Sequence, residues 1–308
     1  MIPGLTSTNG QFVASVDNIQ TQLSNTQNQL STGLRVNQAS DAPAQLGDIF
    51  QARADLAHVS QVAQNLANVQ AVVNAGDNSV QSAIQLLQNA LSLGAQGASS
   101  TASTTLQGSL ATQVQDLLSQ LVGLSQTQVN GAYIFSGDQS GSAPYQLDPT
   151  SPTGVKQLVT TPATEQIADP TGVTFSISIT AQQLFDARDT SNNPTPQNAF
   201  AALNGLQLAL QSGNTANIQS ALDNVRAASG YLNQQLSFFG TAQNRISSGI
   251  DLAKKFQLQD QTQLSSLQDA DPTALALQLT QETTQLNAAM AAESRQPRTT
   301  LFDYLPIG

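Results

Sequence analysis

Apolar residues recur in this chain at alternating spacings of four and three, and this pattern restricts the fold more than any other feature. Near the start it produces one stripe, made of Phe12, Val16, Ile19, Leu23, Thr26 and Leu30. A second, longer series runs from Leu56 to Leu91, and a third runs from Leu106 to Leu124. Because such spacings place side chains on one narrow face of a helix, they predict long helices that pack as in coiled coils. The glycine-rich stretch Gly94 to Ser100 is expected to end the second helix.

The period changes between Val129 and Thr180. V-T-F-S-I-S-I-T, Val173 to Thr180, alternates apolar and polar side chains as a half-buried strand does. Most of the prolines lie between Pro144 and Pro196. We therefore predict a small insert made of β-hairpins, with a hairpin turn in S-G-D-Q-S-G-S, Ser136 to Ser142.

Helical spacing resumes from Phe200 to Leu210 and again from Ile218 to about Leu267. D-A-D-P, Asp269 to Pro272, should stop this helix because proline lacks a backbone donor, and Asp271 can cap the next one. The last stripe is Leu275, Leu279, Leu286 and Met290. This break near the end of the chain mirrors the one at Leu30 to Ala44, where Gly33 should end a helix and Ser40 or Asp41 should start the next.

Together these elements predict a mainly α protein, an elongated antiparallel helical bundle with paired terminal helices and a small β-hairpin-rich insert. The expected organisation has five parts. Residues 1–43 form the amino-terminal helix and a connector, and residues 44–128 form the first half of the bundle. Residues 129–193 form an outward-facing β-rich insert, residues 194–268 the second half of the bundle, and residues 269–308 the carboxy-terminal helix and tail.

The terminal helices are the candidate functional site. A pair of helices with one stripe each buries too little apolar area to offset a chain entropy of roughly 1–2 kcal/mol per residue. We expect these ends to be disordered alone and to become ordered when copies assemble. The predicted assembly interface consists of Phe12, Val16, Ile19, Leu23, Leu30, Arg35, Leu275, Leu279, Leu286, Met290 and the aromatic-apolar tail residues Phe302, Tyr304 and Leu305.

Composition argues against several classes of function. Charged residues make up 10% of the chain, against roughly a quarter in ordinary proteins, and the formal net charge is -10. The ten lysines and arginines are scattered, so no basic stripe is available for nucleic acid. Cysteine is absent, which rules out disulfides and thiolate metal sites. We expect neither a membrane span nor a general secretory signal, because no apolar run has the length or flanking charges of either.

No set of catalytic or metal-binding side chains can be recognised. His58 is the one histidine, so neither a histidine pair nor a Ser-His-Asp set can form. Asp269 and Asp271 fit a helix cap better than paired catalytic carboxylates, because a proline follows them. Arg35, Arg53, Arg226 and Arg245 stand out in a charge-poor chain, and each guanidinium suits pairing either between subunits or within the chain. We predict no catalytic, cofactor-binding or metal-binding residue, no cofactor and no enzymatic activity.

Several segments resemble one bacterial family. L-S-T-G-L-R-V-N-Q-A-S-D-A-P-A, Leu30 to Ala44, resembles the signature near the amino terminus of bacterial flagellins and their junction relatives. F-G-T-A-Q-N-R-I, Phe239 to Ile246, and L-Q-D-A-D, Leu267 to Asp271, are similar to segments in their carboxy-terminal half. V-N-G-A-Y-I-F-S-G-D-Q-S-G-S-A-P-Y, Val129 to Tyr145, and T-T-L-F-D-Y-L, Thr299 to Leu305, resemble the hook-associated members of this superfamily more than flagellins.

This resemblance implies a structural, self-assembling subunit of the extracellular bacterial flagellum at the junction of hook and filament. It implies type III export through the flagellar apparatus, with an export chaperone as partner. Other expected partners are copies of the chain in a ring or tube, a neighbouring hook-associated protein and flagellin, whereas nucleic acid and membrane insertion are not expected. The terminal helices would form an inner tube. Two alternatives stay open: a short flagellin that forms the filament, and, less favoured, an adhesin or enzyme seated in the β insert.

Overall fold

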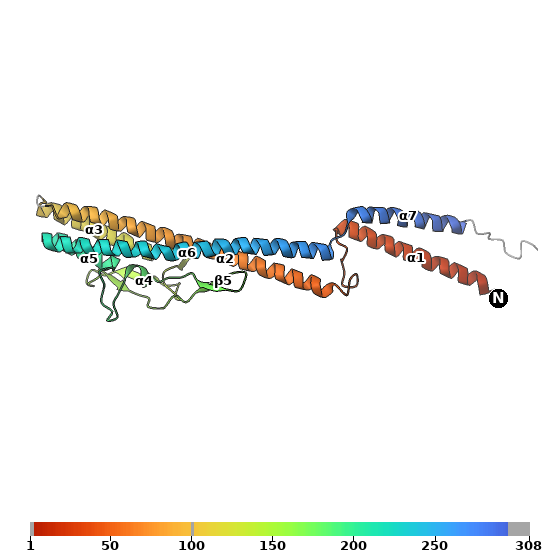
Figure 1. The fold of residues 1–308 in the computed structure, drawn as a ribbon, viewed down its shortest axis with the longest axis horizontal. Helices are drawn as coiled ribbons and strands as arrows, with labels where there is room; N and C mark the ends of the chain where they lie inside the picture. Colours follow the sequence, from red (N-terminus) through yellow and green to blue (C-terminus); the bar gives the residue numbers. More distant parts are fainter. Residues whose placement is uncertain (1–2, 100–101, 295–308) are drawn as a thin grey trace, which may run out of the picture. The chain divides into compact units, whose positions relative to one another are not determined.

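This computed structural model describes residues 3–99 and 102–294, with side chains from residue 10 onward. The chain folds into two compact units, one formed by residues 1–58 with 256–308 and the other by residues 59–255. Two long helices, α2 (Leu46–Gly97) and α6 (Thr215–Gln268), contribute residues to both units (Figure 1). The predicted mainly α fold with long antiparallel helices and small sheets is confirmed. The five-part organisation predicted above stays a prediction.

The unit of residues 59–255 is a helical bundle. In it α3 (Thr104–Ser125) and α5 (Ala199–Ser212) pack beside the long helices, and the short α4 (Ala181–Phe185) follows the last strand. Caps define where these helices begin: the Ser103 side chain accepts a hydrogen bond from the backbone N–H of Leu106, and Asn198 accepts one from Ala201. The periodic apolar residues lie in the core, where the most completely buried side chains include Leu66, Leu87, Leu121, Leu203 and Ile218.

As predicted, the second helix ends within the stretch Gly94 to Ser100, because the last residue of α2 is Gly97. Gly94 and Gly97 also allow close packing between helices. A Cβ added at Gly94 would lie 2.5 Å from Cδ2 of Leu222, and one at Gly97 would overlap Cδ2 of Leu210. Gly76 has the same role opposite Phe239, whose Cε1 would overlap an added Cβ. These glycines are therefore needed for contact, not for chain reversal.

Six short strands in the described residues form three antiparallel pairs. These are β1 (Gln128–Val129) with β2 (Ala132–Tyr133), β3 (Tyr145–Leu147) with β4 (Val155–Gln157), and β5 (Gln166–Ala168) with β6 (Thr174–Ser176). The predicted hairpin turn at Ser136 to Ser142 is wrong, because this segment connects β2 to β3, which do not pair. The first hairpin turns at Asn130 and Gly131, both with positive φ, as a two-residue loop of this kind requires.

A buried polar cluster joins the strand region to the helices. The carboxylate of Asp186, which is fully buried, accepts hydrogen bonds from the Tyr145 hydroxyl (2.8 Å), Nε of Arg188 (2.8 Å) and Nδ2 of Asn198 (2.5 Å). Burial, and secondarily the negative charge of Asp186, raises the pKa of Tyr145. The cluster thus links β3, the loop after α4 and the first turn of α5.

The other unit contains both terminal helices, α1 (Pro3–Thr32) and α7 (Pro272–Ser294). The two chain breaks predicted to mirror each other lie together in it. Gly33, with φ +73°, ends α1, and its carbonyl accepts a hydrogen bond from the Ala270 N–H at 3.0 Å. The Arg35 N–H donates to the Gln268 carbonyl at 2.7 Å. As expected, Asp271 caps α7, accepting from Thr273 N at 2.8 Å.

The predicted helix start at Ser40 or Asp41 is wrong, since α2 begins at Leu46. The Asp41 carboxylate instead accepts hydrogen bonds from the backbone N–H groups of Asn37 (2.9 Å) and Gln38 (2.8 Å). It therefore closes the connector on itself, which is the other common use of an aspartate in a turn. None of the helices in the described ranges has the apolar length that a bilayer crossing needs.

Candidate functional site

The two terminal helices pack against each other along a single seam. They are antiparallel, because Thr26 is paired with Glu282 while Leu34 is paired with Asp269. On α1 the seam side chains are half-buried at Phe12, Val16, Ile19 and Leu23, and on α7 Leu275 is buried while Leu279 and Leu286 are half-buried. The seam therefore contains seven of the apolar residues that the sequence placed in the assembly interface.

The seam also contains a buried polar pair that the apolar pattern of the sequence did not predict. Thr26 is 2% exposed and its hydroxyl donates to Oε1 of Glu282, which is 5% exposed, at 3.1 Å. Gln278 donates to the same oxygen at 2.8 Å, whereas Oε2 of Glu282 is buried without a hydrogen-bond partner among the described residues. The spacing Leu275, Leu279, Glu282, Leu286 continues the four-three pattern. This spacing could have identified Glu282 as a seam residue, but a charged side chain is not expected at a buried position.

A polar residue at one seam position of a coiled coil specifies the register of the helices and lowers their stability. A buried carboxylate with one unpartnered oxygen makes this cost larger, because hydrogen bonds offset the desolvation of one oxygen only. The pairing of α1 with α7 is thus defined in register but weak for its length.

Apolar side chains outside the seam stay uncovered in the single chain. On α1 these are Val13, 55% exposed, and Leu30, 41% exposed. On α7 they are Leu277, 63% exposed, and Met290, 54% exposed. Leu277 follows Leu275 by two positions, which rotates it by about 200° to the other side of the helix. Two predicted interface residues, Leu30 and Met290, therefore belong to the uncovered set.

The arginines of the connector region have partners within the chain. One Nη of Arg35 donates to Oε1 of Gln45 at 2.9 Å and to the Leu267 carbonyl at 2.8 Å. Arg53 donates to Oε1 of Gln268 at 2.9 Å. The Arg35 contacts hold the connector against the last turn of α6, and the Arg53 contact holds the first part of α2 against the same turn. Phe302, Tyr304 and Leu305 lie outside the described residues.

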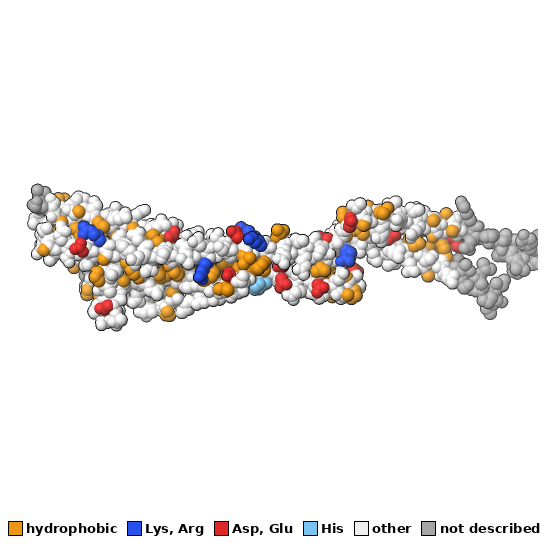
Figure 2. Space-filling model, in the orientation of Figure 1, with side chains coloured by type: hydrophobic (Ala, Val, Ile, Leu, Met, Phe, Trp, Pro, Cys, Tyr) orange, Lys and Arg blue, Asp and Glu red, His pale blue; other side chains and the backbone are white. Residues whose placement is uncertain are grey.

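The described residues contain no cluster of three or more histidine, aspartate and glutamate side chains that would hold a metal ion. His58 is exposed on α2, and Asp271 is engaged as the cap of α7. On the face shown in Figure 2, charged side chains are few and scattered among uncharged polar and apolar ones. The feature with functional potential in this unit is therefore the helical surface.

Comparisons with known proteins agree with this geometry. Residues 8–140 match the family model described as the bacterial flagellin N-terminal helical region. The flagellar hook-associated protein 3 of Escherichia coli (strain K12) is 27% identical over 310 residues, which cover 95% of this chain and 96% of that protein.

Solved structures share the fold at lower identity. A putative flagellar hook-associated protein from Vibrio parahaemolyticus has a TM-score of 0.65 at 14% identity, with 74% of this chain and 100% of that chain covered. Hook-associated protein 3 from Legionella pneumophila has a TM-score of 0.58 at 14% identity, with 71% of this chain and 98% of that chain covered. The chain is thus similar over residues 8–140 to the flagellin N-terminal helical region and over nearly its whole length to a flagellar hook-associated protein 3, and it shares the fold of solved hook-associated proteins.

Proposed function

We propose that this protein is a structural axial component of the bacterial flagellum that joins the hook to the filament by packing of helices between copies. The observation that carries the proposal is the state of the terminal helices. They share one seam, which contains a polar pair, and the apolar side chains of Val13, Leu30, Leu277 and Met290 remain exposed. Copies packed side by side would cover these residues, each of which contributes in proportion to its buried apolar area.

In this proposal the protein acts without catalysis. Export through the flagellar apparatus, an export chaperone, and contacts with a neighbouring hook-associated protein and with flagellin are further parts of the proposal, supported by the motifs shared with junction proteins. The interface would consist of Val13, Leu30, Leu277 and Met290 together with the tail, while the seam residues hold α1 and α7 in register.

A truncation tests the role of the ends. Removal of Met1 to Asn37 and Asp271 to Gly308 takes away α1, α7 and the tail but keeps all of α2 and α6. We expect a folded, monomeric bundle with the circular dichroism of a helical protein that does not assemble. Tubes formed by this fragment, or motility restored by it in a deletion strain, would contradict the proposal.

Imaging of labelled protein on isolated flagella separates the junction role from the alternative of a short flagellin. A signal confined to the boundary between hook and filament supports the junction role, and a signal along the filament supports the flagellin. A deletion strain gives the same distinction, because a strain without the junction protein should build hooks that lack filaments. Filaments on the hooks of that strain would exclude the junction role.

A further inference from the structure

Arg245 on α6 is an exposed cation that the rest of the described chain leaves without a polar partner. Its guanidinium lies over the ring of Phe175, with Cζ 5.7 Å from the ring centroid. Among the described residues, the other arginines donate hydrogen bonds, Arg188 and Arg226 to aspartates and Arg35 and Arg53 to uncharged oxygens. No carboxylate or hydrogen-bond acceptor of the described residues reaches Arg245.

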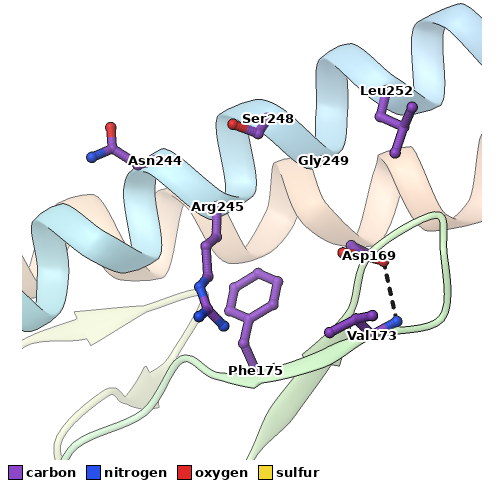
Figure 3. A pocket seen from close by; sticks show the side chains of 8 residues that line it. All are labelled: Asp169, Val173, Phe175, Asn244, Arg245, Ser248, Gly249 and Leu252. Carbon is purple, nitrogen blue, oxygen red and sulfur yellow. Dashed lines mark hydrogen bonds between the residues drawn. The ribbon is translucent and has the colours of Figure 1, made fainter.

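Arg245 lines a pocket of about 360 Å³ between α6 and the β5–β6 hairpin. Figure 3 shows the Arg245 side chain extending from the helix toward the hairpin, beside the Phe175 ring, while Asn244 and Ser248 point away. Leu252 of α6 and Val173 of the hairpin, which is 57% exposed, also line the pocket. The pocket thus places one cation beside the apolar side chains of Phe175, Val173 and Leu252, and polar residues complete its lining.

Asp169 lines the same pocket, but its carboxylate is used by its own turn. Oδ1 accepts hydrogen bonds from the Thr171 hydroxyl (2.5 Å), the Thr171 N–H (2.8 Å) and the Val173 N–H (3.1 Å), and the last of these is drawn in Figure 3. The Thr171 hydroxyl is the main cause of the lowered pKa of Asp169. No ion pair joins Asp169 to Arg245 in the described chain, so Arg245 remains available to a ligand.

The chemistry of this site fits a carboxylate. A guanidinium that stacks on an aromatic ring is held in place by the ring, while its N–H groups point outward in the fork geometry that binds two carboxylate oxygens. The exposed Val173 can contact the methylene groups of the side chain that carries the bound carboxylate. Because the aromatic contact orients Arg245 before binding, less rotamer entropy is lost on forming the pair.

The charge of the chain identifies the source of this carboxylate. The chain has 20 acidic and ten basic residues, so a second copy offers many carboxylates, and a cation at the contact reduces the repulsion between the two net-negative chains. We propose that Arg245, with Phe175 and Val173, is a docking site for an aspartate or glutamate side chain of a second copy of this chain. The proposal rests on the proposed function, in which copies pack side by side.

Zero-length cross-linking on isolated flagella tests the site directly. Arg245→Lys keeps the positive charge and supplies an amine that a carbodiimide couples to a carboxylate in contact with it. We expect a band at twice the mass of this chain, in which mass spectrometry finds the introduced lysine joined to an Asp or Glu of this chain. Arg226→Lys is the matched control: it lies exposed on the same helix and already pairs with Asp223, so its cross-link should stay within one chain.

A charge reversal supplies the second measurement. Arg245→Glu should reduce the assembled protein by about tenfold relative to wild type, which corresponds to the loss of one well-placed charge pair, whereas Arg226→Glu should change it less than about twofold. Equal thermal unfolding of the purified Arg245→Glu and wild-type monomers shows that the reduction in assembly is not a folding defect. If Arg245→Glu does not fold, the cross-link of Arg245→Lys decides alone.

Three outcomes overturn the inference: no dimer band above the Arg226→Lys control, a band in which the lysine introduced by Arg245→Lys is joined to a different flagellar protein, or wild-type assembly of a folded Arg245→Glu variant. These outcomes leave the proposed function intact as long as the wild-type protein is found at the boundary of hook and filament. Absence of the wild-type protein from that boundary would overturn the proposed function itself.

Discussion

The hydrogen bond between Thr26 and Glu282 should be detectable as a coupling free energy between α1 and α7. The perturbations are Thr26→Val, Glu282→Leu and the double variant. Thr26→Val removes the donor 3.1 Å from Oε1 and leaves the buried carboxylate with Gln278 as its remaining described donor. Glu282→Leu removes the carboxylate together with its unpartnered oxygen and completes the apolar seam.

The magnitudes follow from the burial of both groups. A hydrogen bond to a charged group is worth about 1.5–3 kcal/mol, so Thr26→Val should weaken the helix pair by this amount. Replacing a buried charged group by a well-packed apolar one is often neutral or stabilising by about 1–4 kcal/mol, so Glu282→Leu should strengthen the pair. In the Glu282→Leu background, Thr26→Val should cost almost nothing. The coupling energy in this cycle is then about 1.5–3 kcal/mol, a factor of roughly ten to 150 in the opening equilibrium.

Native-state amide exchange of the full-length monomer measures this equilibrium for α1 and α7 separately from the bundle. Wild-type protection should be lower in these helices than in the bundle, and Glu282→Leu should raise it. Thr21→Val is the matched control, because Thr21 is exposed on α1 and its hydroxyl bonds only its own helix, to the Asp17 carbonyl. The reasoning is refuted if Thr26→Val has the same effect in both backgrounds, or if Glu282→Leu lowers the protection of α1 and α7.

Three further predictions concern the bundle. Asp186→Ala removes the acceptor that the buried Tyr145 and Asn198 share with the half-buried Arg188, and it should lower the free energy of unfolding by about 3–5 kcal/mol in urea. Asp223→Ala, at an exposed ion pair, should cost less than about 1 kcal/mol, and similar losses for the two variants would contradict this prediction. The pKa of Tyr145 is raised in the folded state, so its contribution to the free energy of unfolding is complete below the unfolded pKa of about 10 and declines at higher pH, by up to about 1.4 kcal/mol per pH unit. Tyr145→Phe should therefore reduce the loss of stability at alkaline pH, and an unchanged pH profile of stability would disprove this prediction. Gly76→Ala should lower stability in thermal unfolding by about 1–3 kcal/mol, because its Cβ would overlap the Phe239 ring. Gly108→Ala has open space around its Cβ and should stabilise the protein by up to about 1 kcal/mol. A gain in stability at both sites would refute the packing argument.

The fold class and most helix positions were predictable from the sequence, since they depend on local spacing. The stripe from Phe12 to Leu30 lies in α1, and the break at Asp269 to Pro272 separates α6 from α7, with Asp271 as the cap. A proline without an N–H and an aspartate before it act within a few residues, so no tertiary contact is needed to recognise them. The motifs that indicate the flagellin superfamily are likewise properties of the linear chain.

Other features depended on which elements meet. The stretch that begins at Gly94 was recognisable in sequence as the end of a helix, but only the structure shows that Leu222 and Leu210 approach Gly94 and Gly97 too closely for a Cβ. The same holds for the cluster around Asp186, whose partners Tyr145 and Asn198 are 41 and 12 positions away. A local pattern carries no information on such distant donors.

The candidate site shows the same division. The sequence by itself determined that both ends carry a helix with one apolar stripe, because spacing alone defines the face. Only the tertiary structure decided which residues of each stripe are buried in the seam between α1 and α7 and which stay exposed to solvent. This depends on the register of two helices that are far apart in sequence. That register places the Thr26 hydroxyl opposite the buried Glu282 carboxylate, which needs a donor, and leaves Met290 exposed although it belongs to the stripe.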